Sequence, residues 1–347
     1  MRSGKGRHHN PIKWLVCALV VALALLAGCE SRDYVTLNGQ TMGTTWRVTF
    51  AGPADPEALN AAIAQDLRDV NAVMSTWDPA SELSRFNQLD VGESMAVSPS
   101  LPEVLAMARR IHEESGGAFD VTIGPLVNIW GFGPDNRPDE IPTDEVLAAA
   151  LARVDDGALS YEEDRVSRHI DAYVDLSSIA KGYGVDRVAM LLESYGVTDY
   201  LVEIGGELKA RGVNPRGQPW RIAIEKPLAM TRAIQRTLQL RDLAMATSGD
   251  YRNYFEDEGV RYSHIIDPRT GRPITHNVAS ATVLHPIAAM ADGYATALTV
   301  MEVGEGMAMA EENGIAALVI IKSGDGFEEV LSPAMTAYYE SLGPEER

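Results

Sequence analysis

Hydrophobic and polar residues alternate in two distinct periods along the N-terminal part of the chain. Over residues 44–50 every second position is apolar, which predicts a strand with one buried face. Asp55 and Pro56 are typical of a helix N-cap and first position, and apolar residues then recur with helical spacing to about Met74. A second helix is predicted after Pro102.

In the rest of the chain the predicted strands occur in groups between separate helices. Helices are predicted at about 179–195, 289–301 and 304–313, and strands at 200–204, 207–213, 220–225, 236–240, 278–284 and 316–321. Grouped strands are typical of an α+β fold rather than of strict βαβ alternation. We find no repeat and no linker that would divide the chain, so one domain is expected.

The first 28 residues resemble a bacterial export signal. Four basic residues and no acid lie between Arg2 and Lys13, and an uncharged apolar run of 14 residues extends from Trp14 to Ala27. A helix of that length spans about 21 Å at ~1.5 Å per residue, against ~30 Å for a bilayer core. Residues 1–28 therefore predict a signal peptide rather than a transmembrane helix.

The segment Leu26-Ala27-Gly28-Cys29 resembles a lipobox, in which the cysteine is lipidated and becomes the first mature residue. An ordinary signal peptide or an uncleaved anchor is the alternative. We expect residues 29–37 to be a lipid-anchored tether and residues 38–347 to be a domain on the periplasmic side of a membrane. Glu30 replaces the Asp that often retains lipoproteins at the inner membrane, so the choice of membrane is open, with the inner membrane as our expectation.

Composition and charge exclude several function classes. Hydrophobic residues make up 46% of the chain and charged residues 23%, which is typical of a globular protein. The net charge is −19, and without residues 1–28 the 26 basic and 49 acidic residues give −23, so no nucleic-acid partner is expected. Cys17 and Cys29 are the only cysteines, which excludes cysteine nucleophiles and thiolate zinc sites from the mature domain.

Two segments could contact a flat ring. Residues 41–45 combine glycine and threonines with Met42, an adaptable apolar contact, although a turn beside a strand explains them equally. Trp77 follows the first predicted helix, where an indole could stack on an aromatic ligand. A tryptophan in the core is the alternative.

Two further segments favour a nucleotide. Residues 116–133 are dense in glycine, and Asp120 within them could accept hydrogen bonds from a ribose or from ring nitrogens. Residues 175–183 place Ser177, Ser178 and Lys181 at a predicted helix start, where free N–H groups attract phosphate. A serine N-cap is the alternative for the hydroxyls, but it leaves the lysine unexplained.

A last segment, residues 246–297, offers metal ligands. On a helix Asp292 and Thr296 are four residues apart and therefore share one face. One carboxylate and one hydroxyl, completed by water and substrate phosphates, form a typical Mg²⁺ site. The alternative is a solvated helix face.

Taken in order, these segments resemble the ApbE family of FAD:protein FMN transferases over residues 34–325. The most specific stretches are 74–87, 118–133, 175–182, 201–207 (LVEIGGE), 247–254 and 264–271. The resemblance implies that residues 38–347 form a T-fold-like catalytic domain. It also implies Mg²⁺-dependent transfer of FMN from FAD to a Ser or Thr of a target protein through a phosphoester bond, with release of AMP.

The resemblance assigns a role to particular residues of this sequence. The FAD site would be lined by Met42, Trp77, Ala118, Phe119, Asp120, Ser177, Lys181, Glu203, Thr247, Ser248 and Ile266. Asp292, Thr296 and the backbone carbonyl of Ala180 would hold Mg²⁺. His264 would help to deprotonate the acceptor hydroxyl, with Asp267 nearby in the sequence.

The family also implies acceptors, namely exported subunits of NADH:quinone oxidoreductases or of Rnf-type complexes. Two other functions stay open at this point. A Mg²⁺-dependent FAD pyrophosphatase would use water in place of the hydroxyl and release FMN and AMP. A non-enzymatic flavin-binding lipoprotein would store FAD or carry electrons, but it would not need Asp292 and Thr296 together.

Overall fold

One antiparallel sheet of eight strands organises the structure, which is a computed structural model. The described residues are 33–134, 141–228, 233–250, 254–257, 260–324 and 326–342. The predicted signal peptide and Cys29 lie outside them. Within these ranges no helix has both the length and the apolar character needed to span a bilayer.

The strands of the large sheet follow the order β1-β2-β6-β7-β10-β15-β16-β17, and every neighbouring pair is antiparallel. Their bounds are β1 (Tyr34–Thr41), β2 (Thr44–Ala51), β6 (Asp199–Ile204), β7 (Glu207–Arg211), β10 (Ala244–Gly249), β15 (Val278–His285), β16 (Ala316–Ser323) and β17 (Gly326–Leu331). Because successive side chains point to opposite faces of a strand, each face of the sheet has its own set of neighbours.

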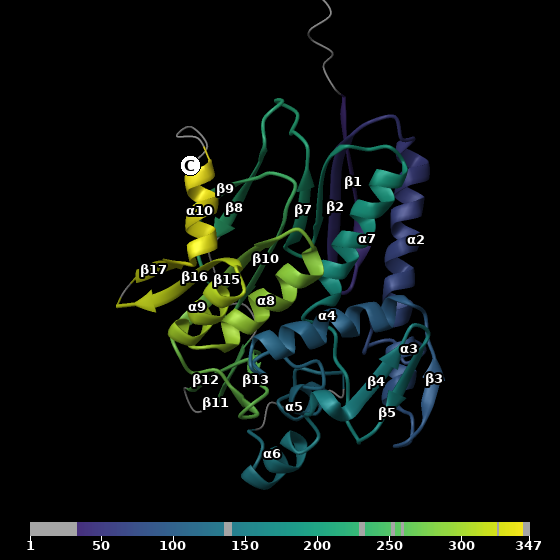
Figure 1. The fold of residues 1–347 in the computed structure, drawn as a ribbon, viewed down its shortest axis with the longest axis vertical. Helices are drawn as coiled ribbons and strands as arrows, with labels where there is room; N and C mark the ends of the chain where they lie inside the picture. Colours follow the sequence, from purple (N-terminus) through teal and green to yellow (C-terminus); the bar gives the residue numbers. More distant parts are fainter. Residues whose placement is uncertain are drawn as a thin grey trace, which may run out of the picture.

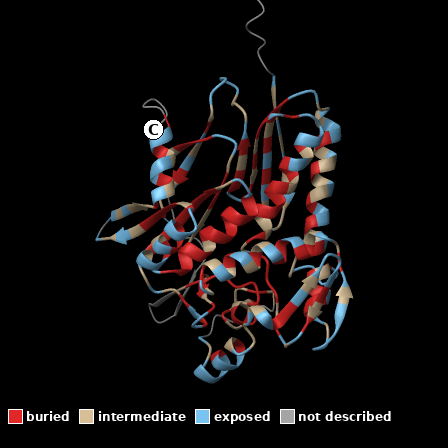
Figure 2. Cartoon of the chain, in the orientation of Figure 1, coloured by how far each residue is buried: buried red, intermediate tan, exposed pale blue. Residues whose placement is uncertain are grey.

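Helices cover one face of the sheet. They are α2 (Pro56–Met74), α7 (Ala180–Ser194) and α8 (Ala288–Val300), with α4 (Ser100–Glu114) packed on α8 and α9 (Val303–Glu312) beside β16 (Figure 1). Their apolar faces and the inward strand positions form the main core. Every residue of α8 except Thr296 is buried, so this helix lies inside the protein (Figure 2).

The opposite face is covered by a hairpin and by the C-terminal helix. The hairpin consists of β8 (Trp220–Glu225) and β9 (Ile234–Leu240), and the helix is α10 (Pro333–Ser341). Their apolar side chains form a second core with β7, β10, β15 and β16.

Short elements surround the end of the helical layer, in the lower part of Figure 1. They are α3 (Glu82–Asn87), β3 (Ser94–Ala96), α5 (Gly124–Ile129), α6 (Asp144–Leu151), β4 (Leu159–Glu162), β5 (Arg165–Arg168), β11 (Tyr254–Asp257), β12 (Val260–Ser263), β13 (Ile266–Asp267) and β14 (Arg272–Pro273).

The predicted α+β class is confirmed, and the two N-terminal patterns correspond to β2 and α2. Asp55 caps α2 as predicted, since its carboxylate accepts the N–H of Ala58 at 3.2 Å. Helix α4 begins at Ser100, before Pro102. A proline is tolerated there because N–H groups in a first helical turn have no acceptor within the helix.

The tether predicted for residues 29–37 is wrong at its end, because β1 begins at Tyr34. Val35 and Leu37 pack on the core while Thr36 is exposed, which is the alternation of a strand. The strand then pairs with β2 along its full length. Met42 and Gly43 form the two-residue turn between them, and both have positive φ, as tight hairpin turns require.

Helices α7 and α8 pack closely at Gly182. A Cβ atom on this residue would lie 2.4 Å from the carbonyl oxygen of Ala288 and 2.8 Å from the Cα of Ala289. The N–H of Gly182 donates to Asp292 Oδ2 at 3.0 Å. The close packing therefore fixes Asp292 against the first turn of α7.

We predict that Gly182→Ala lowers the free energy of unfolding by about 1–3 kcal/mol, because the methyl group would force two backbones apart. Urea denaturation measures the change. Gly304→Ala is the matched control, since Gly304 is an exposed glycine of α9 with no atom near an added Cβ. The control should be neutral or stabilising by up to about 1 kcal/mol. Equal stability of Gly182→Ala and the wild type would show that the packing is not close.

Candidate active site

Two buried acidic side chains and one half-buried lysine meet where α7, β7 and α8 converge. The Nζ of Lys181 lies 3.4 Å from Glu207 Oε1 and 3.9 Å from Asp292 Oδ1. Lys181 is in the first turn of α7, Glu207 begins β7 and Asp292 is on α8. The side chains of the two acids are 5% and 2% exposed, so one ammonium group faces two carboxylates that have little contact with water.

Burial sets the protonation of this cluster. It raises the pKa of Asp292, and it raises the pKa of Glu207 to about 8, while the charge of Lys181 acts against both shifts. Burial lowers the pKa of Lys181, but the two carboxylates outweigh this effect and raise it above its ordinary value. Lys181 therefore stays positively charged at neutral pH. The Oε2 atom of Glu207 is buried and has no hydrogen-bond partner in the described part of the chain.

Asp292 and Thr296 share one face of α8, as their spacing predicts. Thr296 Oγ1 lies 3.1 Å from the hydroxyl of Ser248 on β10. Ala180, the third predicted metal ligand, is the first residue of α7 and lies two residues before Gly182, which donates to Asp292. The predicted metal-binding residues are therefore close to the packing of α7 on α8. A solvated helix face is excluded because α8 is buried.

A cavity of about 420 Å³ lies over this cluster. Most of the residues predicted for the site line this cavity, namely Ala118, Phe119, Asp120, Ser177, Lys181, Thr247, Ser248, His264, Ile266, Asp292 and Thr296. The residues come from five separate stretches of sequence, which the fold brings to one place. His264 also packs edge-on against the ring of Phe132, with 6.2 Å between ring centroids.

A second cavity, of about 290 Å³, adjoins the first at Lys181 and Ser177, which line both. Met42, Trp77 and Ala180 are on its walls, so the structure groups these three predicted residues apart from the others. Trp77 is 65% exposed, which excludes the alternative of a core tryptophan. Its indole is available to a ligand that enters this cavity.

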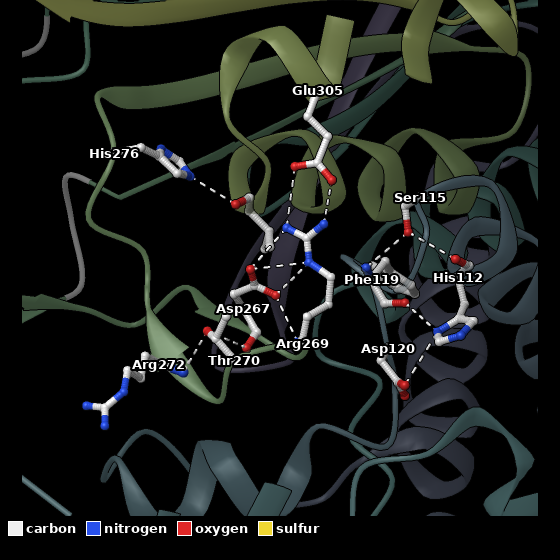
Figure 3. Close-up of polar contacts among 11 residues, drawn as sticks. His112, Ser115, Phe119, Asp120, Asp267, Arg269, Thr270, Arg272, His276 and Glu305 are labelled. Atoms are coloured by element: carbon white, nitrogen blue, oxygen red, sulfur yellow. Dashed lines mark hydrogen bonds and ion pairs between the residues drawn. The ribbon is translucent and has the colours of Figure 1, made fainter. Parts of the chain in front are cut away.

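Asp120 is held by partners on both sides of its carboxylate. Its Oδ1 accepts the N–H and the hydroxyl of Thr122 at 2.7 and 2.6 Å, and its Oδ2 lies 3.4 Å from Nδ1 of His112 (Figure 3). Burial raises the pKa of Asp120, and these two partners act in the opposite direction. His112 also contacts the carbonyl oxygen of Phe119 at 3.0 Å, so it fixes both residues at the cavity.

The serines before α7 are not helix caps. The helix begins at Ala180, with Ile179 at the N-cap position and no side-chain cap. The N–H of Ser177 instead donates to the carboxylate of Asp175 at 2.8 Å. Ser177, Ser178 and Asp175 all line the larger cavity, so these polar groups are directed to the site and Asp175 is a lining residue that the sequence analysis missed.

Asp267, predicted beside His264, forms an ion pair with Arg269 of its own turn. The distance between the two charged groups is 3.0 Å, and Arg269 contacts Glu305 of α9 at 2.5 Å (Figure 3). Asp267 does not line the cavity, whereas Ile266 and Pro268 on either side of it do. Its place in the structure indicates support for the cavity wall.

Glu203 lies on the sheet face opposite Lys181. Ile204 and Glu207 lie opposite each other on β6 and β7, so their side chains share the helix-covered face. Glu203 lies opposite Leu208, and these two side chains point to the other face of the sheet. Glu203 lines a third cavity, of about 460 Å³. The sequence analysis missed Glu207. The two-residue Gly205-Gly206 turn places Glu207 opposite Ile204 and therefore on the helix-covered face, so the turn could have identified Glu207 as a site residue.

Comparison with known proteins shows the family of this chain. The ApbE family model matches residues 42–319. The FAD:protein FMN transferase of Vibrio cholerae is 51% identical over 330 residues, which cover 94% of this chain and 98% of that protein. The protein of the same name from Haemophilus influenzae is 43% identical, with 94% of this chain and 97% of that protein covered.

Solved structures of two proteins named ApbE are similar to this fold. The flavin transferase ApbE from Vibrio cholerae superposes with a TM-score of 0.82 at 49% identity, covering 88% of this chain and 99% of that one. The apo flavinyl transferase ApbE of Pseudomonas stutzeri gives 0.83 at 40% identity, covering 90% and 98%. With a matching family model, these relatives and this fold, the chain belongs to the ApbE family.

Proposed function

We infer that the chain is an FAD:protein FMN transferase, the name carried by its relatives in Vibrio cholerae and Haemophilus influenzae. The hydroxyl oxygen of a target Ser or Thr forms a bond to the phosphorus of the FMN half of FAD. The bond from that phosphorus to the bridging oxygen breaks, and AMP leaves with this oxygen. The hydroxyl proton passes to a base in the site.

The pair of cavities that meet at Lys181 and Ser177 is the observation that carries this function. FAD has two ring systems joined by a diphosphate, and the site offers one compartment for each ring system with a charged ammonium group between them. The positive end of the α7 helix dipole lies at the same place and favours phosphate. Exposed Trp77 supplies a surface for stacking in the smaller compartment.

We assign Mg²⁺ to Asp292, Thr296 and the carbonyl oxygen of Ala180. These donors are all hard oxygens, and Mg²⁺ commonly takes one or two carboxylates with water and substrate phosphates. Two buried acidic side chains lie beside this place, and the Oε2 of Glu207 has no hydrogen-bond partner among the described residues, so oxygen atoms are available to a cation here. When bound, Mg²⁺ neutralises charge on the diphosphate and stabilises the leaving oxygen.

His264 is the proposed base. It lines the same cavity as Lys181 and Asp292, and an imidazole accepts a proton readily at neutral pH. Asp267 supports this role indirectly, because its ion pair with Arg269 ties the following turn to α9. We expect the remaining rate enhancement to come from positioning, since phosphoryl transfer needs little covalent help from protein.

We further propose that Cys29 is lipidated and that the enzyme faces the periplasm from a bacterial membrane, with the inner membrane as our expectation. The basic start, the short apolar run and the Leu26-Ala27-Gly28-Cys29 segment support this proposal. The acceptors would then be exported subunits of NADH:quinone oxidoreductases or Rnf-type complexes.

One assay tests the function against its alternatives. The protein is incubated with FAD, Mg²⁺ and a purified flavin-accepting domain from a sodium-pumping NADH:quinone oxidoreductase. Flavin fluorescence that stays with the denatured acceptor supports transfer. Free FMN with an unlabelled acceptor would indicate a pyrophosphatase, and unchanged FAD would indicate a binding protein.

For Trp77→Ala we expect FAD affinity to fall about 5- to 150-fold, since stacking of a ring on an aromatic side chain is worth about 1–3 kcal/mol. Titration with FAD measures the change. Ile234→Ala is the control, because Ile234 is similarly exposed, at 63%, but lines neither cavity. Equal affinities for the two variants would remove the smaller cavity from the FAD site.

Asp292→Asn keeps the size of the side chain and an oxygen for the N–H of Gly182, but removes the charge. Transfer should fall by at least about 100-fold and no longer respond to added Mg²⁺, because the cation loses its carboxylate. The thermal unfolding midpoint should stay near that of the wild type. Retention of wild-type Mg²⁺ dependence would refute the metal assignment.

In His264→Ala the transfer rate should drop by about 10²- to 10⁴-fold while FAD still binds, which is the usual effect of losing a general base. Rapid mixing with saturating FAD and acceptor measures the chemical step. His169→Ala, which alters a histidine that follows β5 and contacts Ser160 of β4, should leave the rate unchanged. Loss of FAD binding in His264→Ala would make His264 a ligand contact instead of a base.

A further inference from the structure

The third cavity forms a groove on the sheet face opposite α7 and α8. One side is made by outward-facing residues of β2 and β6, and the other by β8. We call it the β8 groove, and it is lined by Thr44, Thr45, Arg47, Thr49, Leu201, Glu203, Gly205, Gly206, Leu208, Ile222, Ala223, Ile224, Glu225, Met245 and Thr247. Its volume of about 460 Å³ is similar to that of the larger FAD cavity.

The groove adjoins the FAD site at two points. Thr247 lines both the groove and the larger cavity. Gly205 separates Thr44 of the groove from Lys181 of the site, because a Cβ on Gly205 would lie 2.9 Å from Thr44 Cγ2 and 3.3 Å from Lys181 Cδ. The end of the groove is therefore one residue away from the charged cluster.

The pairing of β7 with β10 ends at this place. Strands β7 and β10 pair at only two positions, Lys209 with Ala244 and Leu208 with Met245. Beyond Met245 strand β10 continues to Gly249 without further pairing to β7 in the described residues. The pairing thus ends beside Glu207 and Thr247, and Thr247 lines a cavity on each face of the sheet.

The backbone edge of β8 borders the groove. Four consecutive residues, Ile222 to Glu225, line it, whereas a strand that presented one face would contribute only alternate residues. Within the described part of the chain β8 pairs with β9 alone. Strand β9 is in turn held by α10 and β17, through Tyr338 to the carbonyl of Gln239 and through Arg236 to Glu329. The edge of β8 therefore offers backbone donors and acceptors to the groove.

We propose that the β8 groove binds an extended segment of the acceptor polypeptide, which adds as a strand to the edge of β8. Its Ser or Thr hydroxyl would then reach the diphosphate of FAD through the opening at Thr247. The proposal rests on the transferase function, which requires a polypeptide hydroxyl at a buried phosphate. Strand addition suits this task because backbone hydrogen bonds hold a segment without demanding a particular sequence. The threonine-lined wall on β2 suits a polar segment rather than an apolar helix.

Ala223→Trp tests the groove, since Ala223 is exposed, lines it and is remote from both FAD cavities. With a purified flavin-accepting domain of a sodium-pumping NADH:quinone oxidoreductase as probe, KM for the acceptor should rise at least about tenfold while FAD affinity stays unchanged. The control is Arg221→Trp, an exposed position two residues earlier on β8 that does not line the groove, and it should keep the wild-type KM.

Thr45→Trp approaches the groove from β2 and should have the same effect as Ala223→Trp, which guards against misfolding of one variant. A wild-type KM in both groove variants would overturn the proposal, as would a parallel loss of FAD affinity, because the groove would then belong to the nucleotide site. Failure of the wild-type enzyme to label the acceptor at all would instead reject the transferase function.

Discussion

The hydrogen bond from the N–H of Gly182 to the carboxylate of Asp292 joins the two helices on which the chemistry relies. It forms only because residue 182 has no side chain, which lets α7 lie against the backbone of α8. A buried carboxylate would otherwise be costly, so it needs this donor and the nearby ammonium group of Lys181. Packing and catalysis therefore depend on the same contact.

The cluster also explains why a helix as buried as α8 contains an acid. A protein interior disfavours charge unless a counter-charge is supplied, and here Lys181 supplies one for two carboxylates. The cluster thus gathers buried carboxyl oxygens, which are the ligand type that Mg²⁺ prefers, and a bound cation would in turn favour a diphosphate. Ser177 and Lys181, shared by the two cavities, are placed where such a diphosphate would join two ring systems.

The sequence predicted those features that local periodicity determines. Asp292 and Thr296 share a helix face because they are four residues apart, and α2 begins at Asp55 and Pro56 because those residues favour a helix start. Glu207 was missed because its position depends on which faces of β6 and β7 are paired across a turn. Asp267 was predicted from its nearness to His264 in the sequence, which does not decide which side chain lines a cavity, and the structure pairs it with Arg269 instead. The predicted tether extended to residue 37, whereas β1 already begins at Tyr34. The short apolar alternation at the start of β1 does not predict a strand by itself, and pairing with β2 is what makes it one.

In our proposal the two faces of the sheet bind different ligands. The helix-covered face buries charge and suits a nucleotide, while the other face carries the groove beside β8, which among the described residues pairs with β9 alone, and suits a polypeptide. A continuous sheet would keep these ligands apart, because paired backbones leave no passage between its faces. In our proposal the passage lies at Thr247, just beyond the end of the pairing between β7 and β10, because Thr247 lines a cavity on each face beside the cluster of Lys181, Glu207 and Asp292. A reaction between a buried phosphate and a hydroxyl on a folded partner requires such an opening, since the partner is too large to enter the nucleotide cavity itself.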